Sequence, residues 1–168
     1  MTRILVAYAS KMGSNAEIAE AIAGVLRDAG LEAEALPAKE LRDLTPYDAV
    51  VLGSALYAAH WQRDANRFVA RNREALRERP LWLWSSGPLD RALAVVNMPL
   101  TPNATETIGD LPYRAHHTFG GRLDPEAPGV DAQIVATHQV GDFRPWAAIL
   151  EYAAKIAREL ASDLADPA

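Results

Sequence analysis

The stretch that decides the fold is Arg3-Ile4-Leu5-Val6-Ala7-Tyr8-Ala9 and, directly after it, Ser10-Lys11-Met12-Gly13-Ser14-Asn15. The first run is almost wholly apolar, which is typical of a parallel strand covered on both faces. Residues 15–29 then place apolar side chains at helical spacing, and Gly30 suits the end of that helix. A turn rich in hydroxyls and glycine between strand and helix gathers backbone N–H groups at the positive end of the helix dipole. The stretch therefore predicts a phosphate-binding loop.

A plainer interpretation of the same loop is an ordinary strand-to-helix turn. Ser14 with Glu17 three residues later fits a capping box, in which Ser14 serves only as the N-cap. We prefer the phosphate-binding loop because it follows the carboxyl end of a strand, where doubly wound folds bind ligands. Lys11 would add a positive charge at the same place, with a simply solvated side chain as the alternative.

The rest of the chain continues to alternate between strands and helices. Further strands are expected at 32–36, 48–53, 81–86 and 118–123, and further helices at about 62–78 and 145–162. This succession predicts an α/β three-layer sandwich with a five-stranded parallel sheet. Strand 32–36 alternates charged and apolar residues and is expected at an edge, which favours the strand order 2-1-3-4-5.

Length and composition limit the classes of protein that fit. At 168 residues the chain is expected to form a single domain, 1–168, with a lid or insertion region at about 88–115. The net charge of −5 argues against nucleic acid as the main partner. The lack of cysteine excludes disulfides, thiol chemistry and cysteine-ligated iron–sulfur clusters. No transmembrane segment or signal peptide is evident, so we expect a cytoplasmic location and leave peripheral membrane contact open.

Four motifs in order resemble the flavodoxin family, and within it the subgroup that contains menaquinone-dependent protoporphyrinogen oxidase. They are the loop 10–15 after the first strand, Val51–Tyr57 with His60-Trp61, Phe119–Leu123, and Gly141–Trp146. The resemblance implies a flavodoxin-like fold and flavin mononucleotide (FMN) as the cofactor. It covers most of the chain.

The first loop departs from the flavodoxin pattern T/S-x-T-G-x-T at two positions. Ser10 and Gly13 match, whereas Met12 and Asn15 replace hydroxyl residues. We expect Asn15 to donate to the phosphate through its side-chain amide, and Met12 only through its backbone N–H.

Two later strand ends are expected to hold the flavin ring. Tyr57 and Trp61 are candidates to stack on the flat apolar ring, with packing of Trp61 under the following helix as the alternative. Ser85, Ser86 and Gly87 are candidates for its polar edge. The full set of predicted cofactor-binding residues is Ser10, Lys11, Met12, Gly13, Ser14, Asn15, Ala55, Leu56, Tyr57, Trp61, Ser85, Ser86 and Gly87.

The histidines do not predict a metal site. His116 and His117 would point to opposite faces of a strand, and neither they nor His138 have ligands at a suitable spacing. We name no catalytic acid or base, because the flavin itself would carry the electrons.

The leading hypothesis is an FMN-binding redox protein that resembles a flavin-dependent oxidase or quinone reductase. Its partner would be a small-molecule substrate or a redox partner protein. Two alternatives stay open: a non-enzymatic electron carrier, and a binding module of the same fold that has lost FMN.

Overall fold

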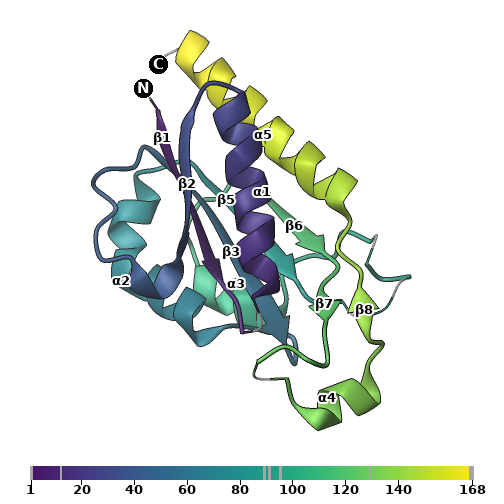
Figure 1. Cartoon of the computed structure of the whole chain (residues 1–168). Coiled ribbons are helices and arrows are strands. Elements are labelled where there is room, and N and C mark those ends of the chain that lie inside the picture. The colour runs from purple at the N-terminus through teal and green to yellow at the C-terminus, as the bar shows by residue number, and fades with distance from the viewer. Residues whose placement is uncertain are drawn as a thin grey trace.

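The computed structural model describes residues 2–11, 13–88, 90, 92–94, 96–128 and 130–166. A parallel sheet forms the middle layer, and helices cover both of its faces (Figure 1). The strands are β1 (Arg3–Ala9), β2 (Glu32–Pro37), β3 (Ala49–Tyr57), β4 (His60–Trp61), β5 (Leu81–Ser86), β6 (Ala115–Phe119), β7 (Arg122–Leu123) and β8 (Gly141–Asp142). The helices are α1 (Ser14–Asp28), α2 (Arg63–Arg77), α3 (Pro102–Ile108), α4 (Ala132–Thr137) and α5 (Trp146–Ala165), with a 3-10 turn, η1, at Ala38–Glu40. None of these helices is long and apolar enough to cross a membrane.

The main sheet has the strand order β2-β1-β3-β5-β6, with every neighbouring pair parallel. This confirms the predicted fold class and strand order. β1 and the first part of β3 are almost fully buried, whereas β2 at the edge is half exposed, as its charge alternation predicts. β3 runs beyond residue 53 to Tyr57 because β4 pairs with its end as an antiparallel hairpin.

Two apolar cores flank the sheet. On one face α1 and α5 pack against each other and over the central strands, and on the other face α2 and α3 cover the sheet. Trp82 and Trp84 of β5 are fully buried between the sheet and the first helix pair, as expected. Burial of a large apolar side chain stabilises the fold by about 1.5–3 kcal/mol. The strand ends from which the functional loops leave are therefore firmly held.

The last strand of the sheet is not where the sequence predicts it. β6 is Ala115–Phe119, whereas the expected strand was 118–123. The chain leaves the sheet at Gly120, where an added Cβ would lie 2.2 Å from the carbonyl oxygen of Phe143. Residues 122–123 then form β7, which pairs antiparallel with β8 in a separate small sheet. The close approach of a second backbone segment ends the strand.

The amino end of α1 also differs from the expectation. The helix begins at Ser14, and its N-cap is Gly13, which has a φ of 82° in the left-handed region. Ser14 is therefore not the N-cap, and the predicted capping box of Ser14 with Glu17 is wrong. Glu17 instead forms ion pairs with Arg122 and Arg144. A side-chain acceptor for the first turn comes from outside the helix, because Ser10 Oγ accepts from the Asn15 N–H at 3.4 Å.

Candidate functional site

The loops that follow β1, β3 and β5 leave the sheet at the same end, because the strands are parallel and their carboxyl ends lie together. Beyond these carboxyl ends lie α4 and the β7–β8 pair (Figure 1). We call residues 10–15 the β1 loop. We call the hollow between the ends of β3 and β5 the β3–β5 cavity. Together they contain most of the predicted site residues.

The β1 loop presents an open approach to the amino end of α1. Apart from the two chain neighbours of Gly13, no heavy atom of the described residues would lie within 4 Å of a Cβ added there, so glycine is needed for its backbone conformation and not for space. Ser10 Oγ accepts a hydrogen bond from the Asn15 N–H at 3.4 Å, and its own proton can still be donated to a ligand. Ser14 is the buried first residue of the helix. The predicted donor Met12 lies outside the described residues.

The side chain of Asn15 does not face the ligand side of the loop. It is fully buried, and its Nδ2 donates to the Ala9 carbonyl at 3.4 Å. Its Oδ1 accepts from the indole Nε1 of Trp84 at 3.0 Å. The expected side-chain donation from Asn15 to a phosphate is therefore wrong. Asn15 instead ties the start of α1 to the core, because the buried indole N–H needs an acceptor.

A buried arginine, which was not among the predicted site residues, supports the β1 loop. The Arg144 side chain is only 3% exposed. Its Nη1 donates to the Ser14 carbonyl at 3.2 Å and to Glu17 Oε2 at 3.1 Å, while Nε and Nη2 bond the two oxygens of Asp142. The hydrogen bond from Arg144 holds the pKa of Asp142 below its usual range. In sequence, the only sign of this role is the Gly141–Trp146 motif.

The hairpin after β3 forms one wall of the β3–β5 cavity. Tyr57 is 39% exposed, and the ammonium of Lys11 lies 4.2 Å from the centre of its ring. The β1 loop and the cavity are therefore neighbours. The turn residues Ala58 and Ala59 have φ values of 51° and 63°. This left-handed conformation is costly for residues other than glycine, so the turn at the cavity wall is strained.

Four of the predicted ring-binding residues instead use their polar groups within the protein. Trp61 is 3% exposed, and its indole N–H donates to Ser85 Oγ at 2.9 Å, so its ring packs in the core beside α2 and is not placed to stack on a ligand. Ser86 Oγ donates to the Gly120 carbonyl. The Gly87 N–H donates to the Phe119 carbonyl. Ser85, Ser86 and Gly87 thus do not offer these groups to a polar ring edge, although Gly87 still lines the cavity.

The β3–β5 cavity has a volume of about 600 Å³, within the range of small-molecule sites. Apolar atoms from the β3 hairpin, from Gly87 and Pro88, and from Leu93 and Met98 form most of its lining. The opposite wall is α4, a helix with no buried residue, which offers Gln133 and Thr137, and His138 directly after the helix adds to this wall. Leu56 and Tyr57 line the cavity, whereas Ala55 lies half buried just before them in β3.

The adjacent histidines are half-buried in β6. Burial lowers the pKa of His116 to about 4, and His116 Nε2 lies 2.9 Å from Ser85 Oγ. His117 stacks on Phe119 with ring centres 4.6 Å apart, and burial also lowers its pKa. Among the described residues, no three His, Cys, Asp or Glu side chains are grouped as metal ligands would be. His116 is therefore neutral at pH 7.

Comparison with known proteins agrees with this geometry. A family model described as "Flavodoxin domain" matches residues 5–130. No curated protein matches the sequence significantly. The fold is similar to flavodoxin 2 from Bacillus cereus (TM-score 0.62, 18% identity, 96% of this chain and 99% of that chain) and to a point mutant of a flavodoxin from Pseudomonas aeruginosa (0.64, 17%, 95% and 99%). The fold is also similar to part of the rubredoxin oxygen:oxidoreductase of Desulfovibrio gigas (TM-score 0.65, 15% identity). The similarity covers 98% of this chain but only 37% of that chain.

Flavodoxin domains bind FMN, and the residues of this site fit that cofactor. The amino end of α1, whose N-cap Gly13 has no side chain, and the open space beside Gly13 suit a phosphate group. The adjoining cavity is mainly apolar, with Tyr57 at its wall, and suits a flat aromatic ring. The binding roles of the individual residues stay a prediction.

Proposed function

Because the chain belongs to the flavodoxin domain family, we propose that it is an FMN-dependent oxidoreductase with a small-molecule substrate of its own. The observation that carries this proposal is the β3–β5 cavity of about 600 Å³. Its walls include α4 and the segment around Leu93 and Met98, which extend over the strand ends. A protein that only exchanges electrons with another protein can leave the flavin edge open, whereas a small substrate needs enclosing walls.

The β1 loop and the β3–β5 cavity would have different roles in binding. When bound, FMN supplies electron or hydride transfer at its ring. The β1 loop would hold the phosphate through backbone N–H groups and Ser10. Leu56 and Tyr57 would contact the ring, while Leu93 and Met98 keep water from the cavity. The polar residues of α4 would orient a substrate through hydrogen bonds.

The substrate class proposed is a flat, largely apolar molecule such as a quinone. The mainly apolar lining supports this class, and the polar side chains of Gln133 and His138 on α4 suit its carbonyl oxygens. The sequence resemblance to menaquinone-dependent protoporphyrinogen oxidase suggests the same substrate class and adds protoporphyrinogen as a candidate reductant. The cytoplasmic location and the absence of a nucleic-acid partner stay predictions of the sequence.

A non-enzymatic electron carrier is the second candidate. It is favoured by one observation, namely that single-domain flavodoxins match this chain over 99% of their own length. A carrier would transfer electrons to a redox partner protein across the exposed rim formed by Tyr57 and its neighbours.

The test begins with the purified protein. We expect a yellow preparation that releases FMN on denaturation and shows steady turnover of menadione with a chemical or enzymatic reductant. Ile134→Trp should narrow the cavity from the α4 side and raise the KM for the quinone about tenfold, with FMN affinity changed less than twofold. Leu164→Trp, at an exposed site near the end of α5, is the matched control.

Three outcomes separate the candidates. Quinone turnover that Ile134→Trp impairs supports the oxidoreductase. Exchange with a flavodoxin reductase, without quinone turnover, supports the carrier. If excess FMN produces neither quenching of flavin fluorescence nor a thermal shift, both are excluded and the flavin-free binding module is left.

A further inference from the structure

We propose that Arg144 is a positioning residue for the FMN phosphate, because it holds the first peptide of α1 in place and offsets the charge of Glu17. This inference rests on the proposed binding of FMN. Arg144 lies 130 positions after Ser14, the residue of the β1 loop whose carbonyl it bonds. Arg144 would act through the backbone of the loop and not by touching the phosphate.

The hydrogen bond from Arg144 to the Ser14 carbonyl fixes a peptide of the loop. That carbonyl belongs to the same peptide unit as the Asn15 N–H. Arg144 Nη1 bonds the oxygen of this unit at 3.2 Å, and Ser10 Oγ accepts from its nitrogen at 3.4 Å. Both ends of one peptide are therefore held, and a charged donor on the carbonyl also polarises the N–H groups of the turn. The orientation of this peptide is set before any ligand arrives.

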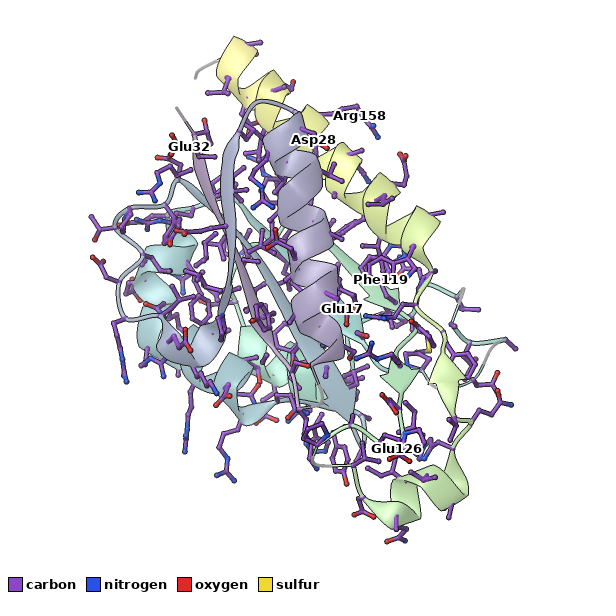
Figure 2. All side chains as sticks on the ribbon, in the orientation of Figure 1. Glu17, Asp28, Glu32, Phe119, Glu126 and Arg158 are labelled. Atoms are coloured by element: carbon purple, nitrogen blue, oxygen red, sulfur yellow. The ribbon has the colours of Figure 1, made fainter. Side chains whose placement is uncertain are left out.

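Arg144 also offsets the charge of Glu17. Figure 2 shows Glu17 near the amino end of α1. An acidic side chain in the first turn suits the helix dipole, but it repels an anion bound at the same end. Glu17 contacts Arg144 at 3.1 Å and Arg122 at 3.1 Å. With Asp142 these residues form a group of two cations and two anions, so Glu17 leaves little net negative charge beside the phosphate.

The Arg144 side chain is itself held rigidly. The guanidinium is bonded on one side to both carboxylate oxygens of Asp142, at 2.9 and 2.7 Å, and lies 4.7 Å from the ring centre of Trp146. A bidentate pair fixes the plane of the guanidinium as well as its distance. Lysine has a compact charge without this planar fork, so it would keep the charge and lose the geometry.

The experiment compares two ligands that differ only in the phosphate. Dissociation constants for FMN and for riboflavin are measured by quenching of flavin fluorescence in the wild type and in Arg144→Gln, Arg144→Lys, Glu17→Gln and the double variant Arg144→Gln/Glu17→Gln. Arg158→Gln is the matched control, because Arg158 is an exposed arginine of α5 that pairs with Glu151, well away from Glu17 (Figure 2). Thermal unfolding without ligand checks that each variant is folded.

We expect Arg144→Gln to raise the Kd for FMN about tenfold and to leave the Kd for riboflavin within twofold of the wild type. The Kd of Arg144→Lys for FMN should lie between the values of the wild type and Arg144→Gln. The double variant should recover, on a logarithmic scale, about half of the FMN affinity that Arg144→Gln loses. A merely structural role for Arg144 would not produce this recovery. Glu17→Gln alone should tighten FMN binding two- to threefold, and this variant tests the charge argument even if Arg144→Gln does not fold.

The inference is overturned if the variants weaken FMN and riboflavin equally, or if Glu17→Gln fails to tighten FMN binding. A wild-type protein that binds neither ligand would overturn the proposed function together with this inference. A wild type that binds FMN, with an unchanged ratio of FMN to riboflavin affinity in the Arg144 variants, would overturn this inference alone.

Discussion

The β1 loop and the β3–β5 cavity are neighbours, joined by the contact of Lys11 with Tyr57, but they are held in different ways. The β1 loop is tied down by buried polar groups: Asn15 bonds Trp84, and Arg144 bonds Ser14. The cavity is bordered by a strained turn and by α4, a helix with no buried residue. The conformation of the β1 loop is therefore fixed before a ligand binds, whereas few internal contacts restrain the walls of the β3–β5 cavity.

This difference is useful in a protein that keeps one cofactor and meets changing substrates. A rigid phosphate site reduces the entropy lost on cofactor binding. A wall with few internal contacts opens at low cost in free energy, which substrate exchange requires. The following predictions test whether the two regions really differ in this way.

The largest effect is expected at Asn15. Asn15→Ala leaves the buried indole N–H of Trp84 and the Ala9 carbonyl without their partner and creates a small cavity. We expect the free energy of unfolding to fall by about 3 kcal/mol, measured by urea denaturation. Gln133→Ala, on the exposed α4 wall, should change it by less than about 0.5 kcal/mol. Similar losses for the two variants would contradict the contrast between the regions.

The next effect is a pH dependence of stability that arises at the Ser85–His116 pair, whose two residues do not line the cavity. The folded pKa of His116 is about 4, below its ordinary value of 6.5, so between these values the unfolded chain binds more protons than the folded one. Stability should therefore fall as the pH drops from 7 to 5, by about 2 kcal/mol from this group. His117, whose pKa is also lowered, acts in the same direction.

His116→Asn isolates this contribution, because asparagine can bond Ser85 but does not titrate. Urea denaturation at pH 7 and pH 5 should give a clearly smaller difference for this variant than for the wild type. His138→Asn, at the exposed end of α4, serves as the control and should keep the wild-type slope. An unchanged slope in His116→Asn would show that other groups cause the pH dependence.

The smallest effects come from exchanging alanine and glycine at left-handed positions in the two regions. Ala58→Gly and Ala59→Gly should each stabilise the protein by about 1 kcal/mol, because glycine adopts these φ values without strain. Gly13→Ala should destabilise it by about the same amount, although a methyl group has space there. Thermal unfolding of the three variants checks the signs, and destabilisation by the glycine variants would show that the hairpin turn carries no strain.

The sequence predicts the scaffold well because apolar periodicity is a local signal of burial. The continuous apolar runs of β1, β3 and β5 place these strands in the centre, and the alternation in β2 places it at the edge. The same signal places the loops that follow β1, β3 and β5 at one end of the sheet, where the sequence predicts the site. Leu56, Tyr57 and Gly87 do line the cavity.

The direction of polar side chains could not be predicted in the same way. Asn15 was expected to face a phosphate, but its partner Trp84 lies 69 residues away on a strand brought close by the topology. Ser85 was expected at the cavity, yet β5 is buried on both faces and its hydroxyl bonds Trp61. Pairings of this kind depend on which strands become neighbours, so one residue and its sequence context do not reveal them.

The contact between Arg144 and Ser14 also has a consequence during protein synthesis. Synthesis runs from the amino end, so Arg144, which holds the first helical peptide of the β1 loop, is added 130 residues after Ser14. A partly made chain can pair its early strands while this peptide is still unrestrained. If Arg144 positions the phosphate as proposed, a chain that ends before residue 144 should bind FMN more weakly than the chain that contains it.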